Sequence, residues 1–172
     1  MKFNYYAFRA MYLHEMDRFK RTLMQSLFSP VLSTSLYFIV FGSVIGGYVE
    51  KIDGISYGSF IVPGLLMLTL LTQSISNTSF GIFFPKFNGT IYEILAAPIS
   101  TFEIVLAFVG AGATKTLIVG LVIFLTSTFF VEVQVMYPLL MIFLLVLVAF
   151  TFALFGFLIG LMSSNFEQMS II

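Results

Sequence analysis

The stretch PLLMIFLLVLVAFTFALFGFLIGLM occupies residues 138–162 and contains no charged side chain. At about 1.5 Å per residue, an α-helix of this length can cross the apolar interior of a bilayer, which is about 30 Å thick. Pro138 suits the start of such a helix because the first helical N–H has no partner within the helix. Three other runs, 31–49, 58–84 and 100–130, carry almost no charge. The sequence therefore predicts an all-α integral membrane protein with four spanning helices.

The composition of the chain agrees with this class. Of the 172 residues 59% are apolar and 9% are charged, whereas a soluble domain needs about a quarter to cover its surface. Lysine plus arginine equals aspartate plus glutamate, 8 against 8, so we expect no nucleic-acid partner. The chain has no cysteine and one histidine, His14, which excludes thiolate metal sites and a multi-histidine site. We expect no catalytic residue, metal site or bound cofactor in this chain.

Residues 3–28 carry a helical stripe of apolar and aromatic side chains. The stripe recurs every three or four residues, at Tyr5, Phe8, Tyr12, Met16, Phe19, Leu23 and Leu27. A basic amphipathic helix of this kind is typical of the membrane interface, so we predict an interfacial helix here. The alternative is an amphipathic helix packed on a soluble partner. Ser29-Pro30 has the pattern of a helix start and is expected to open the first spanning helix.

The distribution of lysine and arginine predicts the orientation. Residues 1–30 contain five of them and the 85–100 loop contains one, against one in the 50–57 loop and none in the 131–137 loop. Positive residues concentrate on the cytoplasmic side of a membrane protein. We therefore expect the N-terminus, the 85–100 loop and the C-terminus in the cytoplasm.

Several polar side chains lie within the predicted spans. In the second span they follow mostly one side of the helix, at Thr69, Thr72, Gln73, Ser76, Asn77 and Ser79. Such groups turn away from lipid, and they either line a translocation path or bond to neighbouring helices. Lys115, in the third span, either lines a path for an anionic substrate or has a structural role, including snorkelling toward the membrane surface.

Glycines within the spans indicate close helix contacts. Gly156 and Gly160, like Gly42 and Gly46, have the four-residue spacing that lets helix backbones approach. Residues 110–116 imitate a phosphate-binding loop, but the spacing of its glycines is wrong and the segment is an apolar helix. We expect these glycines to serve packing as well.

The stretch KFNGTIYEILAAPIS at residues 86–100 is the most informative loop. Thr90 with Glu93, and Ser100 with Glu103, have the spacing of a capping box, and a proline at 98 ends the first of these helices. We predict a short separate helix within 88–98. Its face of Ile91, Ile94 and Leu95 either docks on a partner or packs on the protein's own helices or the lipid surface.

These motifs resemble a known family. The segments Pro63-Gly64-Leu65, Asn88-Gly89-Thr90-Ile91-Tyr92-Glu93 and Ala97-Pro98-Ile99-Ser100 are similar, in this order, to the permease subunit of ABC-2-type exporters. That family exports polysaccharides, nodulation factors and drugs across the bacterial inner membrane. The resemblance implies that 88–98 is a coupling helix on a separate ATPase subunit, with contacts at Asn88, Gly89, Thr90, Tyr92, Glu93, Leu95 and Pro98.

The resemblance further implies a second permease copy in the bilayer and a partner ATPase that uses the ATP and Mg²⁺. It also implies six spanning helices, so we expect residues 1–172 to be one incomplete transmembrane domain without the fifth and sixth helices. The leading hypothesis is therefore the membrane subunit of an ATP-driven exporter. The alternative is a small four-helix membrane scaffold or binding protein. A membrane-embedded enzyme is disfavoured because the spans hold no paired carboxylates, histidine pair or cysteine.

Overall fold

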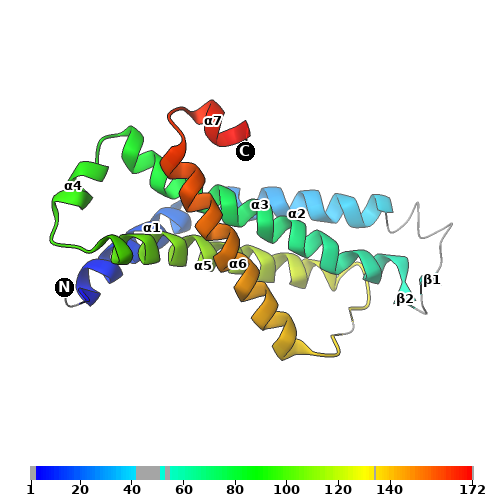
Figure 1. The fold of residues 1–172 in the computed structure, drawn as a ribbon. Coiled ribbons are helices and arrows are strands. Elements are labelled where there is room, and N and C mark those ends of the chain that lie inside the picture. The colour runs from blue at the N-terminus through cyan, green and yellow to red at the C-terminus, as the bar shows by residue number, and fades with distance from the viewer. Residues whose placement is uncertain (1–2, 42–50, 53–54, 134, 172) are drawn as a thin grey trace.

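The computed structural model describes residues 3–41, 51–52, 55–133 and 135–171, and the structural statements below concern these residues. Helices dominate them (Figure 1). A two-stranded antiparallel hairpin replaces the loop expected after the first span, with Ile52 paired to Ile55. The elements in chain order are α1 (Tyr5–Arg21), α2 (Leu23–Val40), β1 (Lys51–Ile52), β2 (Ile55–Ser56), α3 (Tyr57–Phe87), α4 (Ile91–Ala96), α5 (Thr101–Ser127), α6 (Pro138–Met162) and α7 (Phe166–Ile171).

Four of the described helices, α2, α3, α5 and α6, are long and apolar enough to cross a membrane. This confirms the predicted all-α membrane fold and the number of spans. The bounds of α6 coincide with the predicted 138–162, and Pro138 occupies its first turn. The prediction succeeded here because the proline and the uncharged run mark the same boundary.

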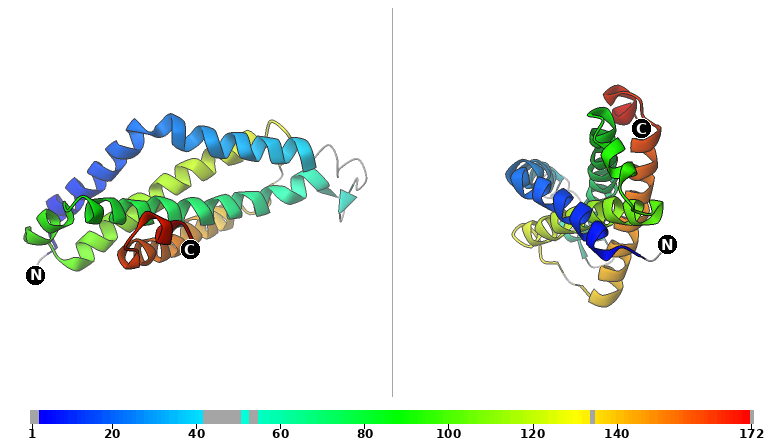
Figure 2. Two further views of the ribbon diagram at one scale, coloured as in Figure 1. Left: turned by 90° about the horizontal axis from the view of Figure 1, so that it is seen from above. Right: turned by 90° about the vertical axis from the view of Figure 1, so that its left-hand side faces the viewer.

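Helix α5 lies at the centre of the bundle, with α1, α2, α3 and α6 against it (Figure 2). It is the most buried of the four candidate spans. Helix α6 crosses α3 at close range, because a Cβ atom at Gly156 would lie 2.5 Å from the Ile75 carbonyl oxygen, and one at Gly160 would lie 2.5 Å from that of Ser79. The close contact predicted for this glycine pair is therefore confirmed within the subunit. Gly42 and Gly46 lie outside the described residues.

The connections between the spanning helices lie at two opposite ends of the bundle. At one end the Lys86 ammonium donates to the carbonyl oxygens of Leu161 (2.7 Å) and Ser163 (2.8 Å), which joins the ends of α3 and α6. The start of α1 and helix α4 lie at this end, here called the α4 end (Figure 2). At the other, here called the hairpin end, the Ser59 hydroxyl of α3 donates to the Glu132 carbonyl oxygen at 2.9 Å.

The boundary between the first two helices differs from the prediction of one helix over 3–28. The chain breaks at Thr22, whose hydroxyl donates to the Arg18 and Phe19 carbonyl oxygens, and α2 begins directly afterwards. Pro30 is therefore inside α2 and does not open a helix. A proline inside a helix removes one N–H from the hydrogen-bond ladder and crowds the carbonyl four residues earlier, but the residues on both sides of Pro30 are helical. The C-terminal part of the predicted first span, 42–49, lies outside the described residues.

Candidate functional site

Helix α4 starts at a glycine turn and not at a capping box. Gly89 has a φ of +79°, in the left-handed region that favours glycine, and it turns the chain away from α3. Thr90 has a helical backbone, and its hydroxyl donates to the Pro85 carbonyl oxygen at 3.3 Å, so no side-chain cap forms. The predicted capping box at Thr90 and Glu93 is therefore wrong. The predicted end is right, since Ala97 is extended before Pro98.

The two sides of α4 have different environments. Ile91 and Ile94 pack against the buried apolar cluster that includes Ile104 and Phe108 of α5. Tyr92, 73% exposed, and Leu95, 61% exposed, face outward. Leu95 is therefore not on the packed face with the two isoleucines, as the sequence suggested. One side of the helix packs on the protein's own core, and the other is uncovered in the part of the chain that the structure describes.

The capping box at the start of α5 is confirmed, and its carboxylate has a further partner. The Ser100 hydroxyl accepts from the Glu103 backbone N–H at 3.3 Å, and Glu103 Oε2 accepts from the Ser100 N–H at 2.8 Å. Glu103 Oε1 accepts from the backbone N–H of Asn4, the N-cap of α1. The turn after α4 and the start of α1 are thus held by one buried side chain.

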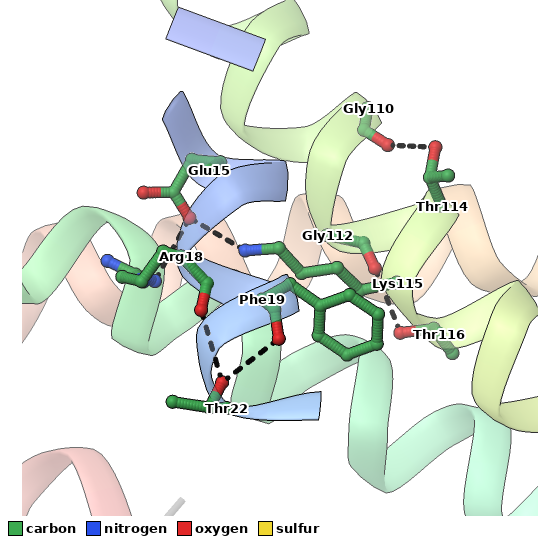
Figure 3. Close-up of polar contacts among 9 residues, drawn as sticks. All are labelled: Glu15, Arg18, Phe19, Thr22, Gly110, Gly112, Thr114, Lys115 and Thr116. Atoms are coloured by element: carbon green, nitrogen blue, oxygen red, sulfur yellow. Dashed lines mark hydrogen bonds and ion pairs between the residues drawn. The ribbon is translucent and has the colours of Figure 1, made fainter. Parts of the chain in front are cut away.

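A buried charge cluster joins α1 to the middle of α5 (Figure 3). Glu15 Oε2 lies 2.8 Å from the Lys115 ammonium and 3.0 Å from Arg18 Nη2. The side chains of Glu15 and Lys115 are each 4% exposed, and that of Arg18 is 28% exposed. Gly81 of α3 leaves room for the cluster, since a Cβ there would lie 3.4 Å from Glu15 Oε2. The three charged residues therefore meet where α1, α3 and α5 converge.

This cluster argues against one interpretation of Lys115, snorkelling toward the membrane surface, while a role in a path for an anionic substrate stays a prediction. The side chain reaches a buried carboxylate, so it does not snorkel to the surface. A structural role is supported, because an ammonium in a membrane span requires a partner.

The residue that the sequence reasoning missed is Glu15. It follows Tyr12 by three positions and precedes Phe19 by four, so it belongs to the helical stripe. The available signal was a charged residue on an otherwise apolar helical stripe, which indicates a buried partner.

The stripe of α1 packs on α5 rather than facing away from the protein. The Tyr12 hydroxyl donates to Thr114 Oγ1 at 2.9 Å, and Phe19 is buried in a cluster with Val119 and Ile123. The contacts follow both helices in the same direction, so α1 runs lengthwise along the first half of α5. The predicted location of α1 in the membrane interface stays a prediction.

Beside the charge cluster is an open cleft of about 470 Å³ between the α1–α2 junction and α3. Ser76 and Asn77 line it together with Lys115, so the structure unites three of the polar span residues singled out above. Thr69 and Thr72 do not line it, and their hydroxyls donate to carbonyl oxygens of their own helix at 2.8 and 2.9 Å. Gln73 accepts from Asn77 at 3.4 Å.

Other sequence features have structural roles. Ser74, which the sequence reasoning did not select, donates to the Ala149 carbonyl oxygen at 2.6 Å and bonds α3 to α6. A Cβ atom at Gly112 would overlap the Thr78 side chain of α3. A Cβ atom at Gly110 would lie at an ordinary contact distance of 3.9 Å from Tyr12. Only the first of these two glycines is needed for close packing. The Pro63-Gly64 part of the family motif is exposed near the hairpin end of α3.

Residues 6–172 match the family model described as ABC-2 type transporter. The chain belongs to this family. The ABC-2 chain is 37% identical over 166 residues to "Inner membrane transport permease YadH" of Escherichia coli (strain K12), of Escherichia coli O157:H7 and of Shigella flexneri. The match covers 96% of this chain and 65% of each relative, so the chain spans slightly less than two thirds of their length. No solved structure matches it.

Proposed function

We propose that the chain is part of the membrane-spanning subunit of an ATP-driven exporter of the bacterial inner membrane, and that α4 docks on a separate ATPase subunit. The observation that carries this proposal is the outward face of α4. Tyr92 and Leu95 are largely exposed on a short helix at one end of the bundle, in a chain of the ABC-2 family. The names of the relatives support inner-membrane transport.

The attachment of α4 suits the transmission of force. Its inner face packs, through Ile91 and Ile94, on the buried cluster formed by residues of α3, α5 and α6, and the turn that follows it is bonded to Glu103 of α5. A push from a partner on the outer face would therefore reach the spanning helices through this cluster and through Glu103. In this proposal, ATP-driven closure of the ATPase moves α4 and switches the transport path between inward and outward openings.

We also propose a second copy of the permease as the partner within the membrane. Ser76 is exposed on α3 within a candidate span, and its side chain makes no hydrogen bond in the described part of the chain, whereas the Thr72 hydroxyl bonds to its own helix. Lipid offers polar side chains no hydrogen-bond partner, so protein or water must cover that face in the assembled transporter.

The test of the α4 interface is a charge reversal with a matched control. Glu93→Arg changes an exposed residue of α4, and Glu132→Arg makes the same change at an exposed position near the hairpin end. The chain is co-expressed with candidate ABC ATPases from its own genome, and co-purified ATPase is measured per mole of chain in the membrane. We expect a loss of about tenfold or more for Glu93→Arg alone, because a misplaced charge at an interface costs several kcal/mol.

Equal ATPase recovery from both variants would contradict docking on α4. Recovery of no ATPase even with the unchanged chain would favour the membrane scaffold instead. The orientation is tested separately with reporter fusions after Asn88 and after Val133. We expect a cytoplasmic signal from the first and an external signal from the second, and the reverse result would overturn the orientation.

A further inference from the structure

Residues of four helices line the cleft beside the charge cluster. Arg18, Phe19 and Thr22 come from the end of α1, and Gln25 and Ser26 come from the first turn of α2. The opposite wall is α3, and Lys115 of α5 lies at the cleft's inner side, fourteen residues past Thr101 and so about 21 Å along the helix. The residues of the α3 wall are Ser76, Asn77 and Phe80.

The positive and negative charges at this cleft do not cancel. Arg18 and Lys115 both line it, and both pair with the single carboxylate of Glu15. Two positive charges therefore share one negative charge, which leaves a surplus of one positive charge beside the cleft. The nearby acid Asp17 does not line the cleft, and it pairs with Lys20 at 2.9 Å on the exposed side of α1.

Hydrogen-bond donors remain for a ligand. A guanidinium carries five N–H groups, and one nitrogen of Arg18 contacts Glu15 while the group lies 5.9 Å from the centre of the Phe80 ring. The Lys115 ammonium is nearly buried, so Arg18 is the cation that a ligand can reach. Within the described part of the chain, the side chains of Gln25, Ser26 and Ser76 make no hydrogen bond.

We propose that this cleft binds a phosphate group, either on a phospholipid headgroup or as the free ion. The surplus positive charge selects an anion. The planar fork of Arg18, with hydroxyl and amide donors from both walls, suits an oxyanion that has acceptor oxygens on several sides. The exposed ring of Phe80 gives the same cleft an apolar part against which the acyl chains of a lipid can lie. This inference concerns a site distant from α4 and does not depend on docking of the ATPase.

The experiment measures binding to the 172-residue chain purified in an uncharged detergent. The probes are dihexanoylphosphatidylglycerol, inorganic phosphate and, as the zwitterionic comparison, dihexanoylphosphatidylcholine. Arg18→Gln removes the reachable cation, and Arg21→Gln removes the same charge one turn later, at an exposed position that does not line the cleft. We expect Arg18→Gln to weaken binding of the anionic probe by about tenfold or more and Arg21→Gln to leave it unchanged.

A second variant tests the cleft independently, in case Arg18→Gln does not fold. Ser76→Phe fills the cleft from the opposite wall and removes none of the charged groups, and it should weaken binding to the same extent. Binding of phosphatidylglycerol alone would identify a lipid headgroup, and equal binding of inorganic phosphate would identify the free ion. The proposal is overturned if neither anionic probe binds, if phosphatidylcholine binds equally well, or if Arg21→Gln weakens binding as much as Arg18→Gln.

Discussion

Glu15→Gln should destabilise the protein far more than its surface counterpart on the same helix. The substitution keeps the shape of the side chain but removes the negative charge in contact with the buried Lys115 ammonium. Removing one member of a buried ion pair costs about 3–5 kcal/mol, because the other charge is left without compensation. Arg18 is partly exposed and can return to solvent, so its lost contact adds little.

For a chain of this length, about 2–4 °C of melting temperature corresponds to each kcal/mol, so the expected shift is on the order of 10 °C. The assay follows the loss of the monodisperse size-exclusion peak of detergent-solubilised protein with increasing temperature. The control is Asp17→Asn, which breaks an exposed ion pair two residues away and should leave the melting temperature unchanged.

The double substitution Glu15→Met with Lys115→Met adds a second criterion. It removes both charges and leaves apolar side chains of similar length, so it should recover most of the stability that either single change loses. The reasoning fails if Glu15→Gln melts within about 2 °C of Asp17→Asn. It also fails if the double variant loses as much stability as the two single changes together.

Three further predictions concern packing and turns. Gly112→Ala should cost about 1–3 kcal/mol in thermal unfolding because its Cβ overlaps a threonine of α3, whereas Gly110→Ala should be neutral or stabilising. Gly89→Ala should cost about 1 kcal/mol because of the positive φ, and Gly64→Ala, which meets nothing within 4 Å, should not. Lys86→Met should release the carbonyl groups at the end of α6, which faster amide exchange after residue 162 would reveal; unchanged exchange would contradict this.

The sequence was sufficient at two helix starts that local chemistry marks. Pro138 and Ser100 each begin a helix as predicted, because a proline in the first turn and a capping box act within a few residues. The break at Thr22 was missed because no proline, glycine or capping side chain marks it, and the apolar stripe continues across it from Phe19 to Leu23. Thr90 was misassigned because its hydroxyl has a competing acceptor in the previous helix.

The candidate site shows the limit of such reasoning more clearly. Lys115 was recognised as unusual, since a lysine in a span requires an explanation. Its partner Glu15 lies one hundred positions earlier in the chain, and no spacing rule connects two residues that meet only through the packing of α1 on α5. Ser76 and Asn77 were identified by their helical periodicity, but the cleft that they share with Arg18 depends on where α1 ends.

Glu103 has a mechanical consequence for the α4 end of the molecule. One oxygen of its carboxylate holds the backbone of Ser100, at the end of the α4–α5 turn, and the other holds the backbone of Asn4, at the start of α1. A torque on α4 would therefore act on α1 and α5 through this one carboxylate, in addition to the packing of the inner face of α4 on the apolar core. Because α1 also carries Arg18, a movement of α4 would be passed through Glu103 and α1 to the wall of the cleft.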